Sequence, residues 1–307
     1  MSANAGETSE TNKTSASKTS ASLMAYDLAV AGEARAIAHA EATTSAPNTR
    51  DSLTAELRAL GVAPGMTLLV HSSQSALGWV CGGPVAIVQA LLDALTPEGT
   101  LVVPTHSGDY SDPANWQHPP VPAAWVPLIR AMMPAFEPQI TPTRQMGAIA
   151  ETARAWPGAQ RSRHPNVSFT AIGPNANTVT ANHSYDDGLG EKSPLARLYE
   201  LDGWVLLLGI GYGNNTSFHL AEYRAPGAVR TMGGAPILDE QGQRIWHVYQ
   251  DIELDDEPFP QIGADYERRA NSADLQVGNV GAAQARLFRQ RPAVDFAQQW
   301  IAQARQG

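Results

Sequence analysis

Short apolar runs and longer amphipathic stretches alternate along the chain from about residue 49. The runs at 66–70 (MTLLV) and 100–104 (TLVVP) have the length and composition of buried strands. Between them, apolar residues recur at helical spacing after Pro84, from Val85 to Leu95. A strand, a helix and a strand within residues 66–104 predict a βαβ unit, in which the two strands are parallel and the crossover is right-handed.

The same alternation continues to the C-terminus. Before the first strand, Thr49 or Asp51 caps a predicted helix that ends at Gly61. Further helices are expected at 125–136, 146–156, 193–201 and 216–224 and as two C-terminal helices, strands at 167–173 and 204–211, and a hairpin over 236–254 that turns at 240–242. The pattern therefore predicts an α/β fold over residues 49–307, a single domain with a mixed central sheet flanked by helices.

Residues 1–48 differ in composition from the rest of the chain. The first 22 are rich in Ser, Thr and Ala and contain no aromatic residue, and residues 23–45 are rich in Ala. Such a composition buries too little apolar surface to offset the entropy of ordering. We expect a disordered or partly helical N-terminal tail without a secretory signal.

The net charge and the cysteine content exclude several classes of function. With 21 basic and 30 acidic residues the net charge is −9, and the only lysines are Lys13, Lys18 and Lys192. This balance disfavours nucleic-acid binding and favours cationic ligands. The single cysteine excludes an internal disulfide, and no apolar run of about 18 residues predicts a membrane span. A cytoplasmic protein without a nucleic-acid or membrane partner is expected.

Polar residues follow the predicted strands, where open α/β sheets bind ligands. His71, Ser72 and Ser73 follow the first strand, and a Gly-rich segment, 209–213, follows the strand at 204–211. The glycines do not fit a dinucleotide fingerprint, because Asn214 stands where the third glycine belongs. A crevice lined by hydroxyls and backbone N–H groups is the more general expectation.

A histidine and an acidic run are the candidates for proton transfer. His219 lies in the first turn of the helix at 216–224, and Glu253 lies in an acidic run where Asp251, Glu253 and Asp255 alternate onto one strand face. A core histidine beside a solvent-facing acidic strand fits the same spacing. No metal-ligand spacing occurs, and Cys81 is expected to pack rather than to react.

Taken together, six collinear segments resemble the aminoglycoside 3-N-acetyltransferases, an antibiotic acetyltransferase family distinct from the GNAT fold. They are LLVHSSxSxLGWVxGG (68–83), LxPEGTLVVPT (95–105), RHPxxSFxAxG (163–173), SPLARLYELDGWVLLLGxG (193–211), NTSxHLAE (215–222) and VGNVGAAQARLFRQRPAVDFAxxW (277–300). The resemblance covers roughly residues 50–300. It implies acetyl transfer from acetyl-CoA, without a metal, to the 3-amino group of the deoxystreptamine ring of an aminoglycoside, as in antibiotic resistance.

Carried over residue by residue, the resemblance makes His219 the base and Glu253 its acidic partner. It places Glu222 at the substrate amine. Acetyl-CoA would contact His71, Ser72, Ser73, Val80, Cys81, Gly82, Gly83, Thr105, His164, Ser168 and Ser193. Direct transfer without an acyl-enzyme is expected, in a monomer or homodimer.

The substrate-facing loops, 106–124 and 182–192, are the least constrained by the resemblance. Asp109, Tyr110, Asp187 and Asp255 suit a cationic sugar, although Asp is also an ordinary turn residue. The alternatives are an acetyltransferase of the same family acting on a nucleoside, peptide or metabolite amine, and a non-catalytic ligand-binding protein.

Overall fold

The computed structural model describes residues 30–35, 37–38, 41–42 and 46–306. It divides into two units, Met1–Pro47 and Asn48–Gly307. In the first unit, residues 30–35, 37, 38, 41 and 42 are helical. Most of the predicted tail, residues 1–48, lies outside the described residues. No described helix combines the length and hydropathy that a bilayer crossing needs.

A mixed seven-stranded sheet forms the centre of the second unit, as predicted. Its order is β3-β4-β2-β1-β5-β9-β8, and β1 runs parallel to both β2 and β5 while the other pairs are antiparallel. The strands are β1 (Thr67–Ser72), β2 (Thr100–Pro104), β3 (Gln160–Arg161), β4 (Phe169–Ile172), β5 (Trp204–Leu208), β8 (Leu275–Val280) and β9 (Ala283–Arg289). The predicted βαβ unit is β1-α3-β2.

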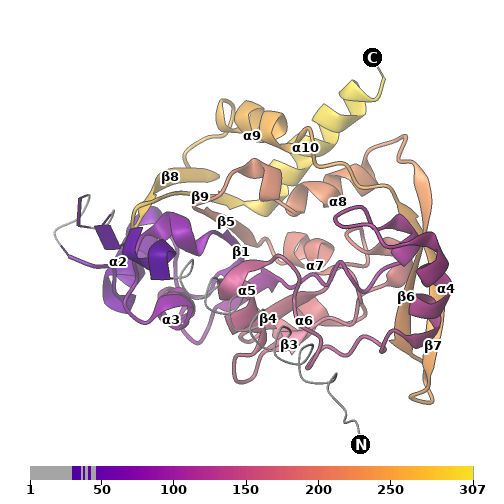
Figure 1. Ribbon diagram of the computed structural model, residues 1–307. Helices are drawn as coiled ribbons and strands as arrows, with labels where there is room; N and C mark the ends of the chain where they lie inside the picture. The colour runs from indigo at the N-terminus through magenta and orange to yellow at the C-terminus, as the bar shows by residue number, and fades with distance from the viewer. Residues whose placement is uncertain (1–29, 36, 39–40, 43–45, 307) are drawn as a thin grey trace, which may run out of the picture. The chain divides into compact units, whose positions relative to one another are not determined.

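Helices cover both faces of this sheet (Figure 1). On one face lie α2 (Arg50–Leu60), α3 (Gly83–Leu95) and α5 (Gly147–Arg154). On the other lie α6 (Ala176–Thr180), α7 (Pro194–Glu200), α8 (Ser217–Arg224), α9 (Phe259–Glu267) and α10 (Gln290–Ala304). β1, β2 and β5 are buried at nearly every position, and each has a continuous apolar run of at least three residues, as expected for strands that are covered on both faces.

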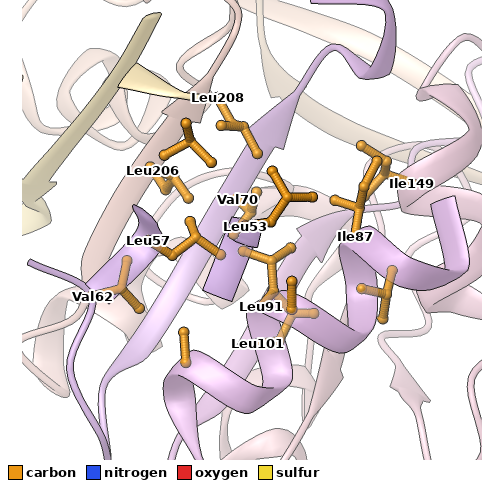
Figure 2. Packing of buried hydrophobic residues seen from close by; sticks show 14 of the residues in the cluster. Leu53, Leu57, Val62, Val70, Ile87, Leu91, Leu101, Ile149, Leu206 and Leu208 are labelled. Atoms are coloured by element: carbon orange, nitrogen blue, oxygen red, sulfur yellow. The ribbon is translucent and has the colours of Figure 1, made fainter. Parts of the chain in front are cut away.

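The apolar residues of the central strands alternate between the two helical layers. Figure 2 shows the first layer, where side chains of α2, α3 and α5 such as Leu53, Ile87 and Ile149 meet the strand residues Val70 and Leu206. The neighbouring strand residues Leu69, Val102 and Leu207 face the second layer with α7, α8 and α10. The carboxyl ends of β1, β2 and β5 are thereby held in fixed register.

A separate two-stranded sheet, β6 (Arg230–Leu238) with β7 (Arg244–Ile252), forms the predicted hairpin. Its turn is built as the sequence indicates, since Asp239 accepts backbone N–H bonds from Gln241 and Gln243 and Gly242 has a φ of +74°. Beside it lies α4 (Val126–Met132) (Figure 1), and Arg244 donates to the carbonyl of Met133 over 3.0 Å.

Three expectations about the elements need correction. The predicted helix at 125–136 is shorter, because α4 ends at Met132. The strand with alternating acids ends at Ile252, so Glu253 and Asp255 lie in the following loop rather than on a strand face. Between the two C-terminal helices, α9 and α10, lies an antiparallel pair, β8–β9, that the hydrophobic pattern did not reveal, since β8 is mostly half-buried or exposed and contains glycine.

Gly209 controls the turn that leaves β5 toward the loop carrying η5 (Tyr212–Asn214) and α8. Its φ is +73°, and a Cβ there would lie 2.5 Å from the Cβ of Ala76. We predict that Gly209→Ala lowers the free energy of unfolding by about 2–4 kcal/mol, through the left-handed backbone and the overlap. Gly211→Ala is the matched control, because its φ is −95° and no atom lies within 4 Å of the added Cβ. Urea unfolding measures both, and equal stabilities would contradict the prediction.

Candidate active site

A cavity of about 270 Å³ opens at the carboxyl ends of β1, β2 and β5. His71 and Ser72 line it from the end of β1, and Thr216 and His219 line it from the start of α8. Asp256 and Phe259 contribute from the segment that leads into α9. The crevice expected beyond the strand ends is therefore present, and it joins segments about 145 residues apart, since Thr216 approaches His71.

His219, which lines this cavity, makes a short polar contact with Glu222 behind it. Nδ1 of His219 lies 2.5 Å from Oε2 of Glu222, one turn further along α8. The carboxyl of Glu222 is buried, and its other oxygen, Oε1, accepts the backbone N–H of Asp255 over 2.9 Å. Because an ionised carboxylate only accepts hydrogen bonds, the proton on this ring belongs to Nδ1. Among the described residues none hydrogen-bonds Nε2, which leaves its lone pair for a group in the cavity.

The sequence-based pairing of His219 with Glu253 does not match this geometry. Glu253 is exposed, and its backbone N–H is bonded to the carbonyl of Val229. The strand ends before it, and no described residue hydrogen-bonds its carboxylate. The acid beside His219 is Glu222, which also accepts the backbone N–H of Asp255. The predicted contact of Glu222 with the substrate amine stays a prediction.

Packing fixes the orientation of α8 at both ends. The His219 ring lies 4.8 Å, centroid to centroid, from that of Phe259. At the other end, the guanidinium of Arg305 donates to the carbonyls of Glu222, Ala225 and Pro226 over 3.2–3.3 Å. The Glu222 carbonyl is in the last turn of α8, where carbonyls lack intrahelical partners, and the other two lie at and just after the C-cap. The histidine and its carboxylate are thus held on a rigid element.

Two further histidines in the cavity are neutral. Burial, with the nearby His219 adding to it, lowers the pKa of His71 to about 3. Burial, with the nearby Arg161 guanidinium and other histidine rings adding to it, likewise lowers the pKa of His106 to about 3. Near neutral pH both rings therefore act as uncharged hydrogen-bonding groups, and neither adds positive charge to the cavity.

Two more cavities adjoin the first. One, of about 520 Å³, shares His106, Gln145 and Met146 with it and is also lined by Asp109 and Arg144, whose charged groups lie 3.9 Å apart. The other, of about 210 Å³, lies under the β6–β7 hairpin and shares Val167, Leu189 and Leu254 with the first. Its polar lining consists mainly of Asp112, His164, Tyr223, Tyr249 and Asp251.

The other predicted substrate residues have structural contacts. Tyr110 packs its ring against Phe136, at 6.1 Å between centroids. Asp187 accepts the backbone N–H of Lys192 over 2.6 Å, and burial raises its pKa. Asp255 lines a separate cavity with Glu222, Glu257 and Trp300. The acidic residues that the sequence placed on one strand face therefore line several cavities, with Asp251 in the one under the hairpin and Asp256 in the one with His219.

Several predicted cofactor residues use their polar groups within the protein. The Ser168 hydroxyl donates to the carbonyl of Thr105, whose own N–H bonds back to the Ser168 carbonyl. Ser193 caps α7, and Nδ1 of His164 accepts the N–H groups of Asn166 and Val167. Only His71 and Ser72 of the predicted set line the cavity with His219.

The Gly-rich segment after β1 lies at the start of α3. Gly82 and Gly83 have φ values of +86° and +55°, and Val80 is buried against Asn48 through an isolated bridge. Ser73 donates its backbone N–H to Leu208. Cys81, predicted to pack, is instead exposed.

Thr216 and Gln145 are lining residues that the sequence pattern did not single out. Thr216 was visible only as part of the NTSxHLAE segment, and Gln145 carries no motif, although its φ of +59° marks an unusual backbone. In the described part of the chain, no group of three or more His, Cys, Asp or Glu side chains is arranged to hold a metal ion.

Comparison with known proteins matches this arrangement to one family. The family model for aminoglycoside 3-N-acetyltransferase matches residues 69–302. The SPbeta prophage-derived aminoglycoside N(3')-acetyltransferase-like protein YokD of Bacillus subtilis (strain 168) is 48% identical, over 84% of this chain and 94% of that protein. Aminoglycoside N(3)-acetyltransferase VII of Streptomyces paromomycinus is 38% identical, over 83% and 92%.

Two solved structures add ligands to the comparison. AAC-IIIb in a binary complex with CoASH is 31% identical, with a TM-score of 0.75, over 84% of this chain and 98% of that one. AAC-VIa bound to sisomicin is 32% identical, with a TM-score of 0.75, over 84% and 99%.

The buried histidines predict an acid-sensitive fold. The pKa of His183 falls to about 4 and that of His164 falls well below its usual value, both through burial, as for His71 and His106. Below about pH 6.5 the unfolded chain binds protons at these rings and the folded chain does not, so stability is lost as the pH falls. From pH 7 to 5.5 we expect a loss of about 1 kcal/mol per histidine, measured by urea unfolding. A stability independent of pH over this range would contradict the burial of four neutral rings.

Proposed function

The chain belongs to the aminoglycoside 3-N-acetyltransferase family of acyltransferases, and on that premise we propose that it acetylates the 3-amino group of the deoxystreptamine ring of aminoglycosides, with acetyl-CoA as donor. The observation that carries the proposal is that His219, which lines the 270 Å³ cavity, is bonded through Nδ1 to the buried carboxyl of Glu222. A relative of similar structure binds CoASH and another binds sisomicin, which supports both substrates.

The pair has the arrangement that a general base requires. An ammonium group has no lone pair, so the amine must first give one proton to solvent and react as the free base, and its nitrogen must lose a second proton as the amide forms. The free amine nitrogen bonds to the thioester carbonyl carbon, and the carbonyl π electrons move to oxygen. Nε2 of His219 accepts the second proton from this nitrogen, and Glu222 holds Nδ1 and stabilises the imidazolium that results. When the carbonyl re-forms, the C–S bond breaks and the CoA thiolate receives the proton from His219.

The cavities accommodate the two substrates in adjoining spaces. We assign the acetyl end of acetyl-CoA to the 270 Å³ cavity, between the end of β1 and α8. The hydroxyls of Thr105, Ser168 and Ser193 are occupied internally, so their part in this proposal is to hold the surrounding loops. We assign the anionic groups of the coenzyme to the Ser72–Gly83 segment. This segment contains no lysine, so backbone N–H groups and hydroxyls would bind these groups there.

We assign the amine substrate to the two adjoining cavities, of about 520 Å³ and about 210 Å³. Asp109, Asp112, Asp251 and Asp256 are the carboxylates that line these three spaces. Asp112 is paired with Arg130, and Asp251 accepts the Tyr223 hydroxyl over 2.5 Å, so part of this negative charge is already compensated. Asp109 has Arg144 beside it at 3.9 Å, so charge attraction for a polycation centres on Asp256.

Arg144 favours a second candidate, a family acetyltransferase that acts on a different amine. Its guanidinium lines the 520 Å³ cavity beside Asp109, where it opposes a polycation and would accept an anionic group of a smaller amine. The name of the YokD relative, which ends in "-like", agrees with this candidate as well as with the first.

A panel assay decides between the two. The protein is mixed with acetyl-CoA and gentamicin-, kanamycin- or apramycin-type amines, and free thiol is followed with time. We predict thiol release that depends on the aminoglycoside, with acetylation of the 3-amino group established by NMR of the product. Absence of turnover across the panel, with acetyl-CoA binding intact by calorimetry, would move the function to the second candidate.

The acidic partner of the histidine is tested with two glutamates. We predict that Glu222→Gln lowers kcat by about 10²–10⁴-fold, because the amide cannot balance the imidazolium. Glu253→Gln, the matched control, is expected to leave kcat within about twofold of wild type, since Glu253 is exposed and apart from the ring. Steady-state kinetics with a saturating amine measures both, and the reverse order of effects would restore Glu253 as the partner.

A further inference from the structure

The hydroxyl of Thr216 does not cap the helix α8, although Thr216 occupies the N-cap position. Thr216 directly precedes α8, where a Thr side chain ordinarily accepts an N–H of the first turn. Its backbone is already helical, with φ −58° and ψ −19°, and its side chain makes no capping bond. Asn215 accepts the Ser217 N–H instead, over 3.3 Å. The helix start is satisfied without Thr216.

The hydroxyl is held by a buried histidine from another element. Oγ1 of Thr216 lies 3.2 Å from Nε2 of His71, at the end of β1. His71 is 4% exposed and remains neutral near neutral pH, so its ring carries one N–H and one lone pair. With the proton on Nε2, His71 donates to Oγ1 and the hydroxyl proton of Thr216 is available to an acceptor in the cavity. An acceptor that arrives there selects this tautomer.

Thr216 and His219 also share a face of the helix start. They are three residues apart, both line the 270 Å³ cavity, and the N–H of His219 bonds to the Thr216 carbonyl over 3.0 Å. A reacting carbonyl in this cavity is therefore within reach of a base on one residue and a hydrogen-bond donor on the other. The backbone N–H of Thr105, an alternative donor, is bonded to the Ser168 carbonyl.

We propose that the Thr216 hydroxyl, oriented by His71, donates a hydrogen bond to the thioester oxygen of the acyl donor and stabilises the negative charge that develops there. This assignment rests on the proposed acetyl transfer and adds the group that binds the oxyanion. The hydroxyl keeps its proton throughout, because the amine proton goes to His219 and then to the leaving thiolate. His71 is a positioning residue, since it acts through Thr216.

The kinetic test removes the hydroxyl without changing the shape of the side chain. Thr216→Val lowers kcat by about 10²-fold with little change in the KM for acetyl-CoA, as expected for a donor that acts mainly in the transition state. Thr216→Ser restores kcat to within about tenfold. Thr180→Val is the matched control, because Thr180 is a buried threonine whose hydroxyl bonds only to the Ala176 carbonyl in α6. His71→Ala and Thr216→Val give non-additive losses if His71 acts through Thr216.

A second measurement needs no amine substrate. Infrared difference spectra of bound acetyl-CoA, labelled with ¹³C at the acetyl carbonyl, report hydrogen bonding to that oxygen as a lower stretching frequency. The band rises in Thr216→Val and stays at the wild-type position in Thr216→Ser. An unchanged band together with a kcat within threefold of wild type would overturn the assignment.

The two measurements also separate this assignment from the proposed function. If the infrared band depends on Thr216 but the protein acetylates no aminoglycoside, the role of Thr216 stands and only the proposed amine substrate is wrong. Failure of the wild-type protein to bind acetyl-CoA overturns both.

Discussion

The parallel pairing of β1 with β5 is the constraint on which the rest of the site depends. Their register places Ser72 beside Leu208, so the residues that follow each strand emerge side by side. Both strands are buried on both faces, between α2 and α3 on one side and α7, α8 and α10 on the other. A shift of one residue would turn their apolar side chains into the wrong layers. The packing of the core therefore also fixes the spacing between His71 and α8.

Within that frame, α8 carries the chemistry on a short and firmly held element. Thr216, His219 and Glu222 follow one another at intervals of three residues, so His219 is a neighbour of both, with Thr216 on the cavity side and Glu222 behind the ring. Glu222 is fixed through both carboxylate oxygens, one by His219 and one by the N–H of Asp255. Because Arg305 occupies the last carbonyls of α8, the C-terminal end of α10 also contributes to the position of this pair.

The sequence predicted the architecture well where each element could be recognised from its own residues. The apolar strands, the βαβ unit and the hairpin turn at Gly242 follow from local patterns, and the structure has all three. The prediction failed where an element depends on a neighbour, as for β8, a half-buried segment containing glycine that is a strand because β9 pairs with it. The histidine was found from its motif. Its partner was missed because Glu222 was assigned to the substrate, and because acids in a loop cannot be placed from spacing alone.

The central claim is that His219 presents a bare Nε2 to the cavity while Glu222 holds the proton on Nδ1. The most direct test is ¹⁵N NMR of the histidine-labelled protein, with the His219 signals assigned by comparison with His219→Gln. At a pH where the ring is neutral, the account predicts a protonated Nδ1 and an unprotonated Nε2, and a loss of that preference in Glu222→Gln. A proton on Nε2 in the wild-type protein, with Nδ1 unprotonated, would contradict the account.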